Sequence, residues 1–139
     1  MDEIQAAFLT VKLKYLDAEN QRRREIAEFY CKNIKNPAII LPDDSSLKLE
    51  ASSLEPQDSG SHVWHLFVLR CKHRDELQKY LSTNNIQTLI HYPVPPHRQK
   101  AFKDWNHELY PLTEQIHREV LSLPISPVMD TAEVKTIVD

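Results

Sequence analysis

The chain has 139 residues, of which 41% are hydrophobic and 27% are charged, and its formal net charge at pH 7 is −3. These values predict one globular domain over residues 1–139 with a sizeable core, and they predict neither a nucleic-acid nor a membrane partner. No apolar run approaches the roughly 20 residues that cross a bilayer. The first residues, MDEIQAAFLT, carry acids where a signal peptide carries bases, so we expect a cytoplasmic protein.

Glycine is almost absent, since Gly60 is the only one in the sequence. Loops that cradle nucleotide phosphates depend on glycine, because only glycine lets the backbone approach a phosphate closely. The sequence contains no GxGxxG and no P-loop. It therefore predicts no nucleotide site of either kind.

Residues 2–33 predict one long N-terminal helix. Its apolar residues form two stripes, one of Ile4, Phe8, Val11 and Tyr15 and one of Leu9, Leu13 and Leu16. Together the stripes are wider than a surface helix needs, so we expect this helix to pack on more than one side. The helix should end before Pro37, because the residue that precedes a proline is pushed out of the helical conformation.

Short strands and helices are expected to alternate along the rest of the chain. In order they are a short buried strand or extended segment over 38–42, a loop over 43–61 with an edge strand near 47–51, a strand over 62–71 and a helix over 74–84. A strand over 87–92, a helix over 107–122, a short extended segment over 123–125 and a last helix over 131–138 follow. The inward positions are expected at Leu77, Tyr80 and Leu81, then at Leu109, Leu112, Ile116, Val120 and Leu123, with Thr131 as the last cap. This order predicts an α+β fold in which helices pack on a small antiparallel or mixed sheet.

The densest polar cluster is HYPVPPHRQ over residues 91–99. His91 and Tyr92 end a predicted strand, and His97 follows a loop that its prolines stiffen. Histidine acts as an acid or base near neutral pH, and tyrosine adds a directional hydrogen bond. Two interpretations stay open from the residues alone: a binding site, or a loop whose histidines cap backbone groups.

Other polar residues favour no site. His62 and His65 are three positions apart, which on a strand points them to opposite faces, so we expect no shared metal. His65 is expected to pack under Trp64 and Phe67 instead. Nucleophile motifs such as GxSxG are absent from the sequence.

Four stretches of the chain carry a family resemblance. Residues 1–30 contain DEIQAA at the start of the long helix, 63–70 read VWHLFVLR, 89–102 read LIHYPVPPHRQKAF, and 119–129 read EVLSLPISPVM. Together they resemble the DegT/DnrJ family of PLP-dependent sugar aminotransferases, over essentially the whole chain apart from 43–61. The combination is specific, whereas any one stretch is weak.

The resemblance implies the C-terminal small domain of a fold-type I aminotransferase, with residues 1–33 leading in from a larger domain that carries the cofactor lysine. PLP is then expected in the full-length enzyme but not bound covalently to this chain, none of whose lysines lies in a similar context. We accordingly expect no catalytic, cofactor-binding or metal-ligating residue here.

Within the family, HYPVPPHRQ is similar to members that aminate C3 of a dTDP-linked 3-keto-6-deoxyhexose. The implied reaction takes an amino group from glutamate and gives it to the nucleotide-linked ketosugar, in a homodimer that serves deoxyaminosugar and lipopolysaccharide or polysaccharide biosynthesis. His91, Tyr92 and His97 are the implied substrate-binding residues on the sugar-nucleotide side. The competing hypothesis is a stand-alone, non-enzymatic α+β module for ligand binding or regulation.

Overall fold

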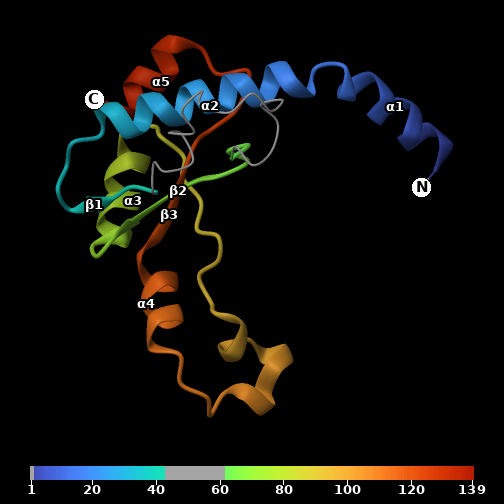
Figure 1. Ribbon diagram of the computed structural model, residues 1–139. Helices are drawn as coiled ribbons and strands as arrows, with labels where there is room; N and C mark the ends of the chain where they lie inside the picture. Colours follow the sequence, from blue (N-terminus) through green and yellow to red (C-terminus); the bar gives the residue numbers. More distant parts are fainter. Residues whose placement is uncertain (1, 43–61) are drawn as a thin grey trace, which may run out of the picture. The chain divides into compact units, whose positions relative to one another are not determined.

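The structure is a computed structural model that describes residues 2–42 and 62–139 (Figure 1). Its contacts form two compact units: of the described residues, the first holds 2–34, 62–65 and 125–139, and the second holds 35–42 and 66–124. That the two make one domain, as the length predicts, stays a prediction. The predicted edge strand near 47–51 lies outside the described residues.

A three-stranded antiparallel sheet forms the centre of the second unit, with β2 between β1 and β3. Its strands are β1 (Ile39–Ile40), β2 (Phe67–Cys71) and β3 (Val120–Leu123). Along β2, buried and half-buried residues alternate as a strand with one covered face requires, whereas all of β3 is buried. Phe67 pairs with Leu123 and Leu69 with Leu121, so apolar cross-strand pairs build the core. The small antiparallel sheet and its helices confirm the predicted α+β class.

Helix α3 (Arg74–Thr83) packs against β2 and β3. It confirms the predicted helix over 74–84 to within one residue. Arg74 and Leu81, seven positions apart, define its buried side. Tyr80 lies off that line and is 64% exposed, so its predicted inward position is wrong.

Helix α4 (Pro111–Glu119) contacts β2 and ends three residues before the predicted limit. Val120 turns to extended backbone and pairs with Arg70, so it belongs to β3 and not to a helix face. Leu109 and Leu112 are 74% and 66% exposed, which contradicts their predicted inward positions. A periodic pattern marks the apolar residues of a helix, but it does not supply the surface that would cover them.

Three of the predicted strands are shorter than expected. The segment over 38–42 pairs only at Ile39–Ile40, and Ile40 is 52% exposed, so the predicted burial of this strand is wrong. Strand β2 begins only at Phe67, because Trp64 has φ 51°, a left-handed conformation that an extended strand excludes. His65 is exposed before the strand, and its predicted packing under Trp64 and Phe67 is wrong. The predicted strand over 87–92 reduces to a single bridge between Leu89 and Ser122.

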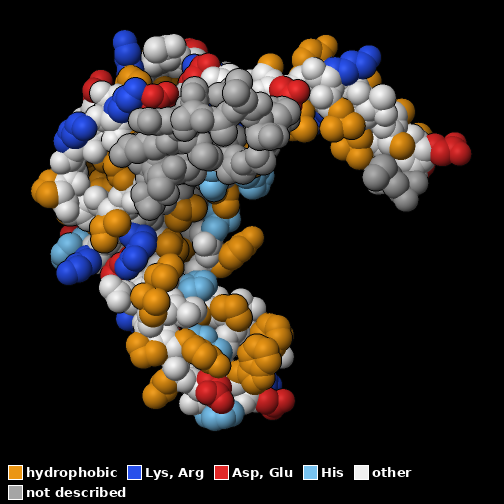
Figure 2. All heavy atoms as spheres, in the orientation of Figure 1, with side chains coloured by type: hydrophobic (Ala, Val, Ile, Leu, Met, Phe, Trp, Pro, Cys, Tyr) orange, Lys and Arg blue, Asp and Glu red, His pale blue; other side chains and the backbone are white. Residues whose placement is uncertain are grey.

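Among its described residues the first unit contains three helices, and the predicted long helix over 2–33 is two of them, α1 (Glu3–Leu13) and α2 (Leu16–Asn33). The interruption contains neither glycine nor proline; the N–H groups of Lys14 and Tyr15 bond three residues back, to Val11 and Lys12, and tighten the end of α1. No residue of α1 is buried, and Figure 2 shows its apolar side chains at the surface.

Helix α5 (Thr131–Val138) confirms the predicted last helix and packs against α2 (Figure 1). Its cap is Asp130 and not the predicted Thr131, because Asp130 and Glu133 exchange side-chain and backbone hydrogen bonds as a capping box. Arg22 of α2 donates to the carbonyl of Met129 at 2.9 Å, just before this cap. None of the helices in residues 2–42 and 62–139 is both long and apolar enough to cross a membrane.

Candidate functional site

The loop over residues 91–99 leaves the sheet at the bridge between Leu89 and Ser122 and is held by its own hydrogen bonds. The side chain of Gln99 donates to the carbonyl of Val94 at 3.2 Å, and the Arg98 N–H donates to the carbonyl of Pro95 at 2.9 Å. The second bond closes a short 3-10 helix, η2 (Pro96–Arg98). With three prolines that restrict its backbone as well, this loop holds its side chains in a defined arrangement.

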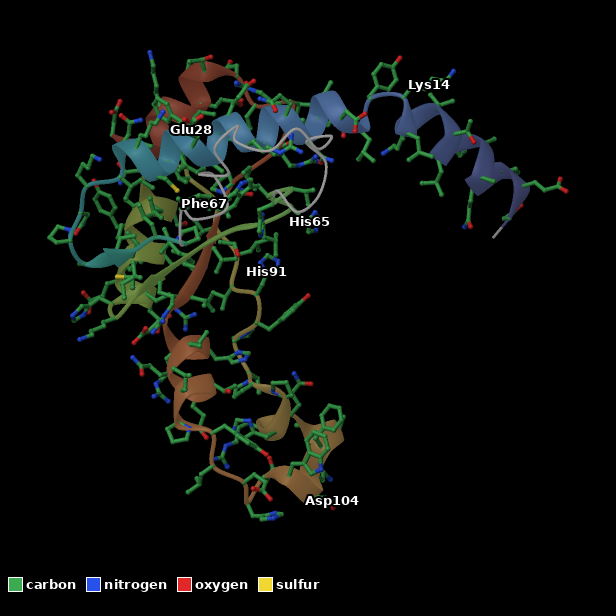
Figure 3. All side chains as sticks on the ribbon, viewed as in Figure 1. Lys14, Glu28, His65, Phe67, His91 and Asp104 are labelled. Carbon is green, nitrogen blue, oxygen red and sulfur yellow. The ribbon has the colours of Figure 1, made fainter. Side chains whose placement is uncertain are left out.

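His91 and Tyr92 lie together at the start of the loop, and we call them the His91–Tyr92 pair. Their rings meet edge to face, with centroids 5.5 Å apart and planes at 87°. His91 is half-buried, beside the sheet (Figure 3), whereas Tyr92 is 66% exposed. The pair therefore offers an imidazole and an exposed phenol from adjacent positions, groups that suit hydrogen bonds to a polyhydroxylated ligand.

His97 lies in a different environment, because it is only 3% exposed. Its Nε2 lies 3.0 Å from Oε1 of Glu114 on α4, and its ring meets that of Tyr110 at a centroid distance of 5.0 Å. Arg98 donates to the same Glu114 oxygen at 2.9 Å and also to the carbonyl of Asn106. We call His97, Arg98 and Glu114 the loop anchor, since they connect η2 to α4.

Two carboxylates on α4 have a lowered pKa because of their neighbours. Hydrogen bonds from His97, and then from Arg98, hold the pKa of Glu114 below its usual range. The pKa of Glu119 is lowered by hydrogen bonds from Gln115, at 2.8 Å, and from Arg70 of β2. The ion pair between Arg70 and Glu119 connects the end of α4 to the sheet. The helix that supplies Glu114 to the loop anchor is therefore itself held against β2.

The structure thus brings together two of the three predicted site residues, His91 and Tyr92, and places His97 in the loop anchor. Three residues that hydrogen-bond the predicted site residues were not predicted from the sequence. Ser122 contacts the His91 ring, His117 donates to the Tyr92 carbonyl, and Glu114 contacts the His97 ring. Ser122 gave no signal because it lies in an apolar stretch that is typical of a core strand. Glu114 and His117 are three positions apart on a helix and so share a face. The sequence around them does not show which segment packs against that face.

A covalently attached cofactor needs a lysine inside an enclosed site. Every lysine among the described residues is exposed at the surface, so none fits that role. Within the same residues, no three side chains of histidine, cysteine or acid type gather as metal ligands would. The polar groups described above are hydrogen-bond donors and acceptors.

Known proteins match the chain over its full length. A protein 55% identical over 139 residues is the dTDP-3-amino-3,6-dideoxy-alpha-D-galactopyranose transaminase of Aneurinibacillus thermoaerophilus, and the match covers 100% of this chain and 35% of that protein. Curated relatives of this kind are thus about three times as long as this chain.

Solved structures match it as well. The structure of S. venezuelae DesV in complex with a ketimine intermediate matches with a TM-score of 0.83 at 36% identity, over 100% of this chain and 35% of that one. A structure of ntda from Bacillus subtilis with bound cofactor PMP matches with a TM-score of 0.81 at 28% identity, over 99% of this chain and 31% of that one. The fold is therefore one that fold-type I aminotransferases contain, as the sequence predicts.

The family model for the DegT/DnrJ/EryC1/StrS aminotransferases matches residues 1–139. This match includes the polar loop, the sheet and the described helices. The chain belongs to the DegT/DnrJ/EryC1/StrS aminotransferase family.

Proposed function

We propose that this chain is the C-terminal small domain of a longer PLP-dependent aminotransferase, which transfers an amino group from glutamate to a nucleotide-linked ketosugar. The observation that carries the proposal is the 55% identity, across the whole chain, to a transaminase of a dTDP-linked 3-amino-3,6-dideoxyhexose. It favours a dTDP-3-keto-6-deoxyhexose as the substrate. The proposal extends to a cytoplasmic homodimer in deoxyaminosugar and polysaccharide biosynthesis, for which membership of the family is the support.

The contribution of this chain is to bind and orient the sugar nucleotide. PLP supplies the electron sink of amino transfer when it is bound, and no described residue of this chain is assigned to it. His91 and Tyr92 would meet the sugar directly, because one is half-buried and the other exposed on a stiff loop. His97 would act on binding through the loop that it anchors, since Glu114 occupies its Nε2.

The exposed apolar side chains of α1 support a longer protein. Ile4, Phe8 and Leu13 are 66%, 68% and 63% exposed, and contiguous apolar surface of this kind usually faces another part of a protein. A stand-alone ligand-binding module would leave it in water. Reading the gene upstream of Met1 separates the two hypotheses: a continuous frame that encodes a cofactor lysine supports the aminotransferase, and a stop codon directly upstream contradicts it.

Separate measurement of the two half-reactions, by the absorbance of the cofactor in the full-length enzyme, tests the site. We expect His91→Ala and Tyr92→Phe to lower kcat/KM for the ketosugar about three- to tenfold, the effect of losing one neutral hydrogen bond. The glutamate half-reaction should be nearly unchanged, because it does not use the sugar contacts. His73→Ala is the matched control, since this histidine is exposed at the start of α3.

Equal losses in both half-reactions, with a lowered melting temperature, would instead make the loop purely structural. The same measurement on His97→Ala determines whether the loop anchor contributes to sugar binding. A loss confined to the sugar half-reaction would support that contribution.

A further inference from the structure

The His91–Tyr92 pair is held from two sides by residues to which no role has been given. Ser122 of β3 meets the His91 ring, and His117 of α4 meets the Tyr92 backbone. Both contacts are long-range in sequence, 31 and 25 positions apart, so neither follows from local chain geometry.

The hydroxyl of Ser122 has a fixed position, because the backbone of this residue pairs with a neighbouring segment on each side of β3. It pairs with Val68 in β2, and on the other side it both accepts from and donates to the backbone of Leu89, at 3.2 and 2.8 Å. Ser122 is 4% exposed, and its Oγ lies 2.9 Å from Nδ1 of His91. The hydroxyl therefore sets the orientation of the imidazole ring.

Either tautomer of the His91 ring can make this contact, because the Ser122 hydroxyl both donates and accepts. If the Ser122 hydroxyl donates to Nδ1, then Nε2 carries the hydrogen and presents a donor; if Nδ1 donates to the hydroxyl, Nε2 presents an acceptor. Among the described residues, no second hydrogen bond to the His91 ring competes with this one. Ser122 therefore holds the His91 ring in place, whichever of its nitrogens carries the hydrogen.

His117 does for the neighbouring backbone what Ser122 does for the ring. A carbonyl oxygen only accepts, so Nδ1 of His117 donates to the carbonyl of Tyr92. His117 lies on α4, which Glu119 ties to Arg70 of β2. The peptide that carries the exposed Tyr92 ring is therefore connected to the sheet through a helix.

We propose that Ser122 and His117 are positioning residues for sugar-nucleotide binding, Ser122 through the ring of His91 and His117 through the backbone of Tyr92. The inference rests on the proposed function, in which the His91–Tyr92 pair meets the sugar. Neither residue needs to touch the ligand itself.

The test uses the full-length enzyme, with dTDP-linked ketosugar and glutamate as separate substrates. Ser122→Ala should lower kcat/KM for the sugar about three- to tenfold, as expected for one neutral hydrogen bond, and Ser122→Thr should restore it. His117→Leu should lower it similarly, and His117→Asn, which keeps a donor near the position of Nδ1, should restore it. The glutamate half-reaction should be unchanged throughout.

A double-mutant cycle separates positioning from a general structural effect. If Ser122 acts through His91, Ser122→Ala should cause no further loss in a His91→Ala background. An equal loss with and without His91 overturns the inference, and so does an unchanged sugar half-reaction in Ser122→Ala when His91→Ala lowers it.

If His91→Ala and Tyr92→Phe themselves leave the sugar half-reaction unchanged, the proposed site fails first and the inference fails with it. Should Ser122→Ala not fold, the paired His117→Leu and His117→Asn variants decide. Loss with leucine and recovery with asparagine support the inference, and equal activity of the two overturns it.

Discussion

Truncation of two leucines distinguishes the core seen in the structure from the core that periodicity predicts. Leu121 of β3, which was not among the predicted inward positions, is fully buried and pairs with Leu69. Leu112 of α4, which was predicted inward, is 66% exposed. Leu→Ala removes about three carbon groups at about 0.8 kcal/mol each, which amounts to roughly 2.4 kcal/mol for a buried side chain. The cavity that remains brings the expected cost at Leu121 to about 3–4 kcal/mol.

At Leu112 the same change should cost less than about 0.5 kcal/mol, because folding buries little of this side chain and because alanine is the better helix former. Urea unfolding of the 139-residue chain, followed by far-ultraviolet circular dichroism, measures both. The midpoint should fall clearly for Leu121→Ala and hardly for Leu112→Ala, at an unchanged slope. The burial seen in the structure would be refuted if the two variants lost unfolding free energy to within about 0.5 kcal/mol of each other. That margin is about the error of adding independent effects.

Three further results are expected. Borohydride reduction of this chain with PLP should label no single lysine stoichiometrically, since every described lysine is exposed; one fully labelled lysine would contradict this. Amides of residues 3–13 should exchange much faster than those of 67–71, because α1 buries nothing, and equal protection in a monomer would count against it. The loop anchor should persist above pH 4.5, the ordinary pKa of Glu114, and should loosen as the pH falls through the lower pKa that Glu114 has in the folded chain. Amide exchange in η2 should become faster at that pH, and Glu114→Gln should abolish this pH dependence.

Sequence alone determined the elements whose signals are local. The amphipathic spacing of 74–84 and the residues of 131–138 each predict a helix from within one element, and the structure confirms both as α3 and α5. The β-branched and aromatic run over 62–71 predicts a strand, of which the structure has only Phe67–Cys71. The polar loop over 91–99 was also visible, since its prolines and histidines are adjacent in the chain. Its role in binding stays a prediction.

Tertiary structure alone decided which surfaces are covered and which side chains meet. Periodicity could not show that Leu112 of α4 lies exposed while Val120 leaves the helix to join β3, because the answer depends on the partner that each face finds. Nor could it join His97 to Glu114, or His91 to Ser122 across 31 positions. The register of β3 against β2 and Leu89 places the Ser122 hydroxyl beside the His91 ring, and a register is set by pairing between distant segments that no local pattern contains.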